Sequence, residues 1–240
     1  MKIALIGYGR MGKAIEEVAV QKGHEIVMKI SIDNTDELTT DNLCKADVAI
    51  EFTGPHSAAE NLISCFKAGL PVVCGSTGWL SEWDEMTAFC KRNNGAFLYA
   101  SNFSIGVNLF FELNTYLAKL MGTYPDYDAR ITEVHHTEKK DAPSGTAITL
   151  ANQVMEHLKQ KTSWVNQTDQ TTDQLQIISE RKDPAPGTHR VLYTSPIDDI
   201  EIIHTAHNRQ GFATGAVLAA EFLFGKKGLY GMKDVLGFKN

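Results

Sequence analysis

A glycine-rich turn near the N-terminus constrains the fold of this chain more than any other feature. Residues 7–12 read Gly-Tyr-Gly-Arg-Met-Gly, directly after an apolar stretch at 2–6 and directly before an amphipathic segment at 13–22. A GxGxxG turn between a strand and a helix is typical of a βαβ unit that binds the pyrophosphate of a dinucleotide at the N-terminus of its helix. This context predicts dinucleotide contacts from Gly7, Tyr8, Gly9, Arg10, Met11 and Gly12.

The first hundred residues continue the same alternation of strand and helix. Apolar strand patterns are expected at 2–6, 25–32, 48–53, 71–74 and 96–100. Helical patterns lie between them at 13–22, 57–68 and 81–92; Ser57 and Glu60 form a capping-box pattern, and Ser81 and Asp84 open the third helix. Alternating elements build a parallel sheet covered on both faces, so a Rossmann-like, doubly wound α/β domain is predicted.

The pattern changes after Asn102. Helices are expected at 107–121 and about 146–161, and strands at 126–136, 175–180, 189–194 and 200–206. Residues 162–174 are polar without an apolar period and are predicted to form an exposed loop. These elements favour a smaller α+β domain with a mixed sheet over residues 104–209. The apolar segment at 213–224 is expected to return to the first domain, which then comprises residues 1–103 and 210–240.

Residues at the ends of the predicted strands complete a nucleotide site. Asp33 ends the second strand pattern, where an acid accepts hydrogen bonds from both ribose hydroxyls of the adenosine. Its neighbour Asn34 offers no charge for a 2′-phosphate, although Arg10 could supply one, so NADH is favoured and NADPH stays open. Ligands of such sheets bind beyond the carboxyl ends of the strands, which adds the turns after the fourth and fifth strands: Gly75, Ser76, Thr77, Ala100, Ser101, Asn102 and Phe103.

A polar cluster at residues 133–146, Glu-Val-His-His-Thr-Glu-Lys-Lys-Asp-Ala-Pro-Ser-Gly-Thr, joins a strand to a helix. An imidazole exchanges protons near neutral pH, an ammonium group binds a carboxylate, and the N–H groups of Gly145 and Thr146 at a helix start can hold a second carboxylate. The cluster therefore predicts a site that holds a small dicarboxylate and protonates carbon. No metal is expected, because His135 and His136 point to opposite faces of a strand and no cysteine or third histidine stands at ligand spacing.

Motifs along the whole chain mark a family resemblance: Gly-Arg-Met-Gly at 9–12, Gly-Ser-Thr-Gly at 75–78, Asn-Phe-Ser-Ile-Gly-Val-Asn at 102–108, the cluster at 133–147, and His-Thr-Ala-His-Asn-Arg at 204–209. The chain resembles the 4-hydroxy-tetrahydrodipicolinate (dihydrodipicolinate) reductases. This resemblance implies NAD(P)H-dependent reduction of a cyclic imine, made from pyruvate and aspartate semialdehyde, to tetrahydrodipicolinate in lysine and diaminopimelate biosynthesis. The chain departs from the family in the close spacing of its first two glycines and in Asn34, which bear on cofactor preference.

The resemblance also assigns roles to residues. It implies that His135 donates or accepts the proton with Lys139 as partner donor, and that the substrate carboxylates are touched by His136, Lys139, Gly145 and Thr146. The glycine turn, Asp33 and the turns after the fourth and fifth strands correspond to cofactor contacts. The domain at 104–209 is expected to bind substrate and to build a homotetramer through its sheet.

Composition narrows the remaining alternatives. A formal net charge of −6 gives no basic field for nucleic acid, and no apolar run approaches the ~20 residues of a membrane span. There is no room for a signal peptide and no CxxC pair among four cysteines, so a cytoplasmic protein with reduced, mostly buried thiols is expected. Two alternatives stay open: another small Rossmann dehydrogenase, which leaves the cluster at 133–146 without a role, and a regulatory protein that binds NADH without turnover.

Overall fold

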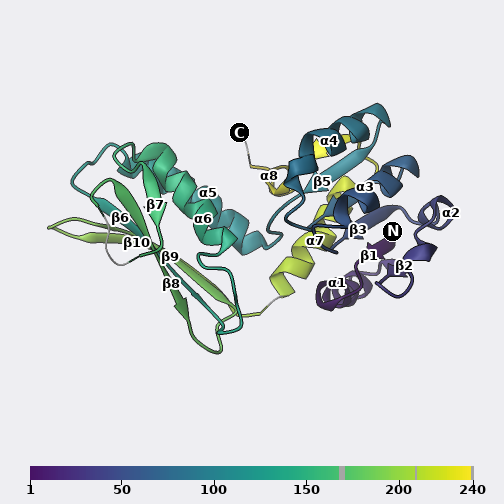
Figure 1. The fold of residues 1–240 in the computed structure, drawn as a ribbon, viewed down its shortest axis with the longest axis horizontal. Helices are drawn as coiled ribbons and strands as arrows, with labels where there is room; N and C mark the ends of the chain where they lie inside the picture. Colours follow the sequence, from purple (N-terminus) through teal and green to yellow (C-terminus); the bar gives the residue numbers. More distant parts are fainter. Residues whose placement is uncertain (168–170, 209, 239–240) are drawn as a thin grey trace. The chain divides into compact units, whose positions relative to one another are not determined.

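The computed structural model describes residues 1–167, 171–208 and 210–238 and divides the chain into two compact units (Figure 1). The first unit combines Met1–Ile105 with Gln210–Asn240, and the second is Gly106–Arg209. Each unit has its own sheet. Across the described ranges, no helix combines the length and the apolar character needed to cross a membrane.

The first unit is built on a parallel sheet with the strand order β11-β5-β4-β3-β1-β2. Its strands are β1 (Lys2–Ile6), β2 (Glu25–Ile30), β3 (Val48–Glu51), β4 (Val72–Cys74), β5 (Ala96–Tyr99) and β11 (Gly228–Tyr230). Its helices are α1 (Arg10–Gln21), α2 (Thr40–Leu43), α3 (Ala58–Lys67), α4 (Trp83–Arg92), α7 (Gln210–Leu223) and α8 (Met232–Leu236). The predicted Rossmann-like sheet is confirmed. The short elements β11, α2 and α8 were not predicted, because three to five residues show no clear period.

Both faces of this sheet are buried, as a doubly wound fold requires. In β1 the side chains alternate: Ile3 and Leu5 lie in a core shared with α1 and α7, whereas Ala4 and Ile6 lie in a second core shared with α3 and α4. Helix α7 meets the sheet through small, fully buried residues: Ala213, Ala216, Ala219 and Ala220. The segment that returns from the second unit is therefore part of the core of the first.

Two helix starts differ from the prediction. Ser57 lies in the right-handed helical region and makes no capping bond; its hydroxyl donates instead to Thr53 Oγ1 at 3.0 Å, in the turn after β3. A 3-10 turn, η2 (Leu80–Glu82), precedes α4, so Ser81 does not cap that helix. The expected capping box is wrong because Ser57 lacks the extended backbone from which an N-cap side chain reaches the N–H groups of the first turn.

The four cysteines are free, and three of them match the expected core thiols. Burial and the nearby Glu51 carboxylate raise the pKa of both Cys65 and Cys74, so these thiols stay protonated and unreactive. Cys44 is exposed, because it follows the short α2 at the surface.

The second unit is a mixed sheet with the strand order β10-β9-β6-β8-β7, and two helices cover one face (Figure 1). Its strands are β6 (Asp128–His135), β7 (Ser163–Val165), β8 (Gln174–Arg181), β9 (Gly187–Thr194) and β10 (Asp199–Ala206), and its helices are α5 (Ile105–Met121) and α6 (Gly145–His157). Strand β6 pairs parallel with β8 and antiparallel with β9. The predicted mixed sheet is confirmed.

The loop expected at 162–174 is more ordered than predicted. It contains β7, a three-residue edge strand paired with β8, which is too short to show an alternating pattern. Lys161 before it is buried, with Nζ 2.6 Å from Asp128 Oδ1 and donating to the carbonyl oxygens of Thr172 and Gln174. Residues 168–170 of the predicted loop lie outside the described residues.

Candidate functional site

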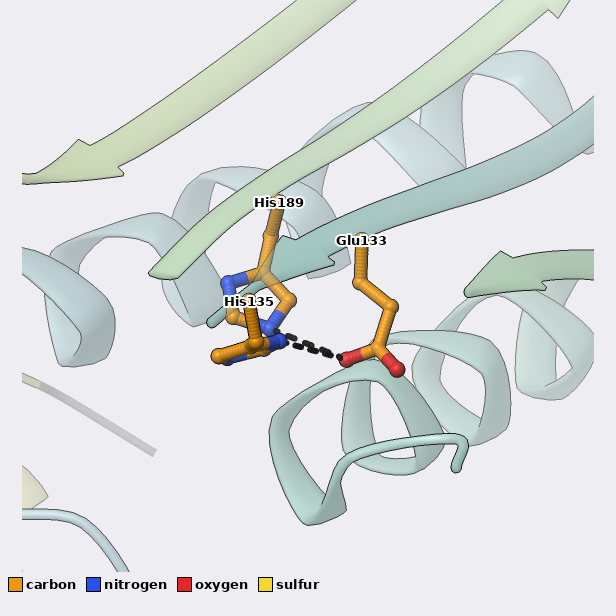
Figure 2. Close-up of side chains that lie close together, drawn as sticks. All are labelled: Glu133, His135 and His189. Carbon is orange, nitrogen blue, oxygen red and sulfur yellow. Dashed lines mark ion pairs between the residues drawn. The ribbon is translucent and has the colours of Figure 1, made fainter. Parts of the chain in front are cut away.

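The register of the second sheet brings polar side chains from three strands together. Glu133 and His135 are two residues apart on β6 and therefore share one face. Across the sheet, Glu133 pairs with Ser179 of β8 on one side and with His189 of β9 on the other, and His135 pairs with Arg181. Figure 2 shows the imidazoles of His135 and His189 next to the Glu133 carboxylate. Residues far apart in sequence thus form one cluster.

Glu133 is the centre of this cluster and is fully buried. Its Oε1 accepts hydrogen bonds from Ser144 N at 3.0 Å, Ser179 Oγ at 2.7 Å and Arg181 Nη2 at 3.2 Å. Burial alone favours a higher pKa for Glu133, but the close His135 ring and the hydrogen bonds from Ser144 and Ser179 outweigh burial and hold its pKa well below the usual range. The cluster therefore contains a buried, ionised carboxylate.

Two imidazoles face the second carboxylate oxygen, Glu133 Oε2. His135 Nδ1 lies 3.2 Å from it and His189 Nε2 lies 3.9 Å from it. The His135 contact is close enough for an ion pair but is not aligned as a full hydrogen bond, as catalytic pairs often are before they tighten around a substrate. Burial, followed by the nearby His135, lowers the pKa of His189 to about 4, so this ring is neutral near pH 7.

Arg181 connects the buried carboxylate to the loop that carries Lys139. Its Nη2 donates to the carbonyl oxygen of Asp141 at 2.6 Å as well as to Glu133, and its Nε donates to the carbonyl oxygen of Lys139 at 3.3 Å. The Lys139 ammonium itself lies 2.8 Å from the largely exposed Asp141 carboxylate. That hydrogen bond holds the pKa of Asp141 below its usual range. Arg181 therefore holds the backbone of the loop, while the Lys139 ammonium pairs with Asp141 near the surface.

The start of α6 lies against the same carboxylate. Ser144 caps the helix by accepting from Ala147 N at 3.2 Å, and its own N–H is the group that donates to Glu133. A Cβ added at Gly145 meets no heavy atom within 4 Å, so the backbone there is open to an approaching group. With Thr146 next to it, this helix start can hold an anion.

His135 and His136 lie in different surroundings. His135 is only 8% exposed and lies in the Glu133 cluster. The backbone N–H of His136 donates to the carbonyl oxygen of Ala185 at 2.9 Å. Its side chain lines a pocket in the second unit together with Asp183, Pro184, Ala185, Pro186 and Asn208. The structure therefore separates the two histidines.

In the first unit, the glycine turn joins β1 to α1, which begins at Arg10 within the turn. Gly7 has φ +98°, and a Cβ there would lie 2.1 Å from the carbonyl oxygen of Phe52. A Cβ on Gly12 would lie 2.5 Å from the carbonyl oxygen of Gly7, whereas a Cβ on Gly9 would meet nothing within 4 Å. The protein therefore needs Gly7 and Gly12 for its own packing and leaves the backbone at Gly9 open for a ligand.

Asp33 is exposed beyond the end of β2. Its backbone N–H donates to Ser31 Oγ at 3.2 Å. The neighbouring Asn34 turns its side chain inward, accepting from Ser31 N at 2.7 Å and donating to the carbonyl oxygen of Lys29 at 3.0 Å. Asn34 therefore shapes the turn, and the carboxylate of Asp33 is left at the surface.

The turns after β4 and β5 lie at the same carboxyl edge of the sheet. Thr77 and Ser101 are exposed there, and Gly75, Ala100 and Asn102 are half-buried. Ser76 is buried and donates to the fully buried Glu51 carboxylate at 3.0 Å, and the Phe103 ring packs in the core, 5.5 Å from Phe52. These two side chains support the turns, so any cofactor contact from them is expected through the backbone.

Three ligand atoms from Glu133, His135 and His189 lie within 4.8 Å of one another, a spacing that suits a metal ion. No further histidine stands at ligand spacing along the sequence, but the pairing of β6 with β9 brings His189 next to Glu133. The Arg181 guanidinium already lies 3.2 Å from the carboxylate, however, and compensates its charge without a metal ion.

Sequence reasoning missed the supporting roles of Glu133, Ser179, Arg181 and His189. The last three lie 46 to 56 residues beyond Glu133 along the chain. Only the strand register identifies them, and a one-residue slip in that register would turn them to the opposite face.

Comparisons with known proteins point to the same family for both parts of the chain. The family model described as dihydrodipicolinate reductase, N-terminus, matches residues 1–103, and the C-terminus model matches residues 106–236. A 4-hydroxy-tetrahydrodipicolinate reductase from Christiangramia forsetii is 49% identical over 243 residues, with both chains fully covered. A 4-hydroxy-tetrahydrodipicolinate reductase from Methanoculleus marisnigri is 37% identical over 80% of this chain and 77% of that one. A dipicolinate-bound dihydrodipicolinate reductase from Paenisporosarcina sp. TG-14 shares the fold, with a TM-score of 0.77, 24% identity and 98% of each chain covered.

Proposed function

The chain belongs to the dihydrodipicolinate reductase family, and we propose on that basis that it reduces 4-hydroxy-tetrahydrodipicolinate to tetrahydrodipicolinate with NAD(P)H. The observation that carries the proposal is the buried, ionised Glu133 carboxylate, which faces His135 and the start of α6 at once. A proton-exchanging group next to an anion-holding helix start suits a dicarboxylate that must take up a proton. The alternative function, as another small Rossmann dehydrogenase, leaves this cluster without a role.

In this proposal the first unit holds the cofactor, which supplies the hydride when bound. The open backbone at Gly9, the helix that starts at Arg10 and the exposed Asp33 carboxylate fit a dinucleotide. The complete proposed set of contacts is Gly7, Tyr8, Gly9, Arg10, Met11, Gly12, Asp33, Gly75, Ser76, Thr77, Ala100, Ser101, Asn102 and Phe103. We infer NADH as the preferred form, because Asn34 is engaged in the turn and offers no charge to a 2′-phosphate.

The second unit holds the substrate. His136, Lys139 and the N–H groups of Gly145 and Thr146 bind its carboxylates, which places the ring within reach of His135. Loss of water from the 4-hydroxy compound gives a conjugated imine. Hydride addition to that imine leaves an electron-rich enamine carbon, and His135 gives this carbon its proton through Nε2. Lys139 steadies the charge that develops on the substrate. We also place the protein in the cytoplasm, which its reduced thiols support.

A direct assay tests the proposed function. Purified protein is mixed with NADH and with substrate formed enzymatically from pyruvate and aspartate semialdehyde, and the loss of nicotinamide absorbance is followed. Consumption that depends on the imine is expected. Consumption with amino-acid substrates alone would point to another dehydrogenase, and NADH binding without any turnover would point to a regulatory protein.

The cofactor assignment is tested at Asp33. Asp33→Ala is expected to weaken NADH binding about tenfold or more, since a hydrogen bond to a charged group is worth about 1.5–3 kcal/mol. NADPH should lose much less, because its 2′-phosphate cannot use the carboxylate in the same way. Dissociation constants from nicotinamide fluorescence check this, with the exposed Asp36→Ala as a charge-matched control. Equal losses for the two cofactors would show that Asp33 does not bind the ribose.

Assembly as a homotetramer through the open face of the second sheet is a further part of the proposal. Ile203 on the edge strand β10 is 53% exposed and pairs with Arg190, in a row that continues through Thr132 to Ile178 on the face away from the helices. Ile203→Glu is expected to shift the protein to smaller species in sedimentation velocity. Ile197→Glu in the preceding turn, also at an exposed isoleucine, should leave assembly unchanged. A tetramer that withstands Ile203→Glu would exclude this face.

A further inference from the structure

The two oxygens of the Glu133 carboxylate have different partners. Oε1 accepts from three donors, namely Ser144 N, Ser179 Oγ and Arg181 Nη2. Within the described ranges, the neighbours found for Oε2 are the imidazoles of His135 and His189 (Figure 2). A fully buried charge is costly unless such partners compensate it, so this arrangement is more specific than packing requires.

We propose that Glu133 is a positioning residue, which holds His135 through Nδ1 and leaves Nε2 as the atom that exchanges the proton. The inference rests on the proposed role of His135 as the acid. A carboxylate that accepts from one imidazole nitrogen fixes the tautomer and orientation of the ring and stabilises its protonated form. The same carboxylate holds Ser144 at the start of α6, so the acid and the anion-binding backbone share one anchor.

The surroundings of His135 support this orientation. A Cβ on Gly187 would lie 3.1 Å from His135 Nε2, so the glycine keeps space free next to that nitrogen. His189 is neutral near pH 7 and lies edge-on to the His135 ring, with centroids 5.1 Å apart. His189 Nε2 lies 3.2 Å from Ser144 Oγ. His189 therefore fills the space beside the carboxylate without adding a second positive charge.

Arg181 extends the anchor to the other proposed substrate group. One guanidinium joins the Glu133 carboxylate to the carbonyl oxygens of Lys139 and Asp141. Because a guanidinium offers several donors in a fixed plane, it sets the spacing between these groups. The ion pair of Glu133 and Arg181 thus links His135, the Lys139 loop and the start of α6.

The wild-type protein gives the first test, by nitrogen NMR of the histidine rings in ¹⁵N-labelled protein. The His135 signals are identified by their loss in His135→Gln. When His135 is neutral, the proton is expected on Nδ1, with Nε2 bare. A proton on Nε2 of the neutral ring would overturn the proposal. This experiment needs neither substrate nor a folded Glu133 variant.

Substitution gives the second test. In Glu133→Gln the three donors at Oε1 select the amide oxygen, so the amide NH₂ takes the place of Oε2 and faces His135 Nδ1. The tautomer should therefore reverse, and the turnover number should fall by about 100-fold with a smaller change in KM. Glu133→Asp keeps an acceptor and should retain the wild-type tautomer and more of the turnover. Glu156→Gln makes the same chemical change at an exposed position of α6 and should change neither.

The outcomes separate this inference from the proposed function. A wild-type tautomer in Glu133→Gln, or full turnover in that variant, would overturn the positioning role. Loss of wild-type turnover on chelation, restored by Zn²⁺, would also overturn it, because the cluster would then hold a metal ion. A wild-type protein with the expected tautomer but without imine reduction would refute the proposed function instead.

Discussion

Replacing His135 by glutamine is expected to lower the turnover number by about 100- to 10,000-fold, the usual span for a positioned acid–base group. Glutamine cannot deliver a proton from the position of Nε2, but it leaves the proposed carboxylate contacts of the neighbouring groups in place, so KM should change little. The single-turnover rate of hydride transfer measures the effect. A near-normal rate would mean that Lys139, His136 or water supplies the proton.

Lys139→Ala is the informative comparison for that variant. Its ammonium is paired with the exposed Asp141 carboxylate at 2.8 Å, a weak partner that a substrate carboxylate can displace. Loss of the ammonium should therefore raise KM and lower the turnover number, whereas His135→Gln should lower mainly the turnover number. The two variants together separate binding from proton transfer.

Gly7→Ala is expected to destabilise the first unit by about 3 kcal/mol or more. The added Cβ would lie 2.1 Å from the carbonyl oxygen of Phe52, at φ +98°, so both the overlap and the backbone conformation are unfavourable. Urea unfolding followed by circular dichroism measures the loss. An unchanged midpoint would show that the turn after β1 can relax at little cost.

Gly9→Ala is the matched control in the same turn. Its Cβ meets no protein atom within 4 Å and its φ is −88°, so stability should stay close to that of the wild type. NADH binding should nevertheless weaken, because the methyl group would occupy space that we assign to the pyrophosphate. Unchanged NADH affinity in a folded Gly9→Ala protein would remove the glycine turn from the proposed cofactor site.

These glycines also show what could be predicted from sequence. The turn at 7–12 and the strands around it are local patterns. The structure reproduces β1 with the predicted bounds, and each of the other predicted strands lies within a few residues of its expected bounds. Cap positions were less predictable: Ser57 matches a capping box in sequence, but its hydroxyl is engaged by Thr53 in the preceding turn. Local patterns therefore identify the elements more reliably than their ends.

The candidate site was only partly predictable for a different reason. The stretch from Glu133 to Thr146 is continuous, so its acid–base and anion-binding groups are visible in the sequence. Arg181 and His189 enter through pairing with β8 and β9, and no pattern along the chain links either of them to His135. The role of Glu133 follows only after these partners are placed, because its oxygens are distinguished by what surrounds them.

The insertion of the second unit within the first determines the order in which a ribosome can complete the two. The second unit has emerged in full while the first still lacks α7, β11 and α8. Until α7 arrives, the face of the first sheet that carries Ile3 and Leu5 lacks part of its cover, and β5 remains an open edge. Nascent chains usually fold their N-terminal domain first. In this chain the glycine turn is made before the second unit, yet the unit that contains the turn is finished after it.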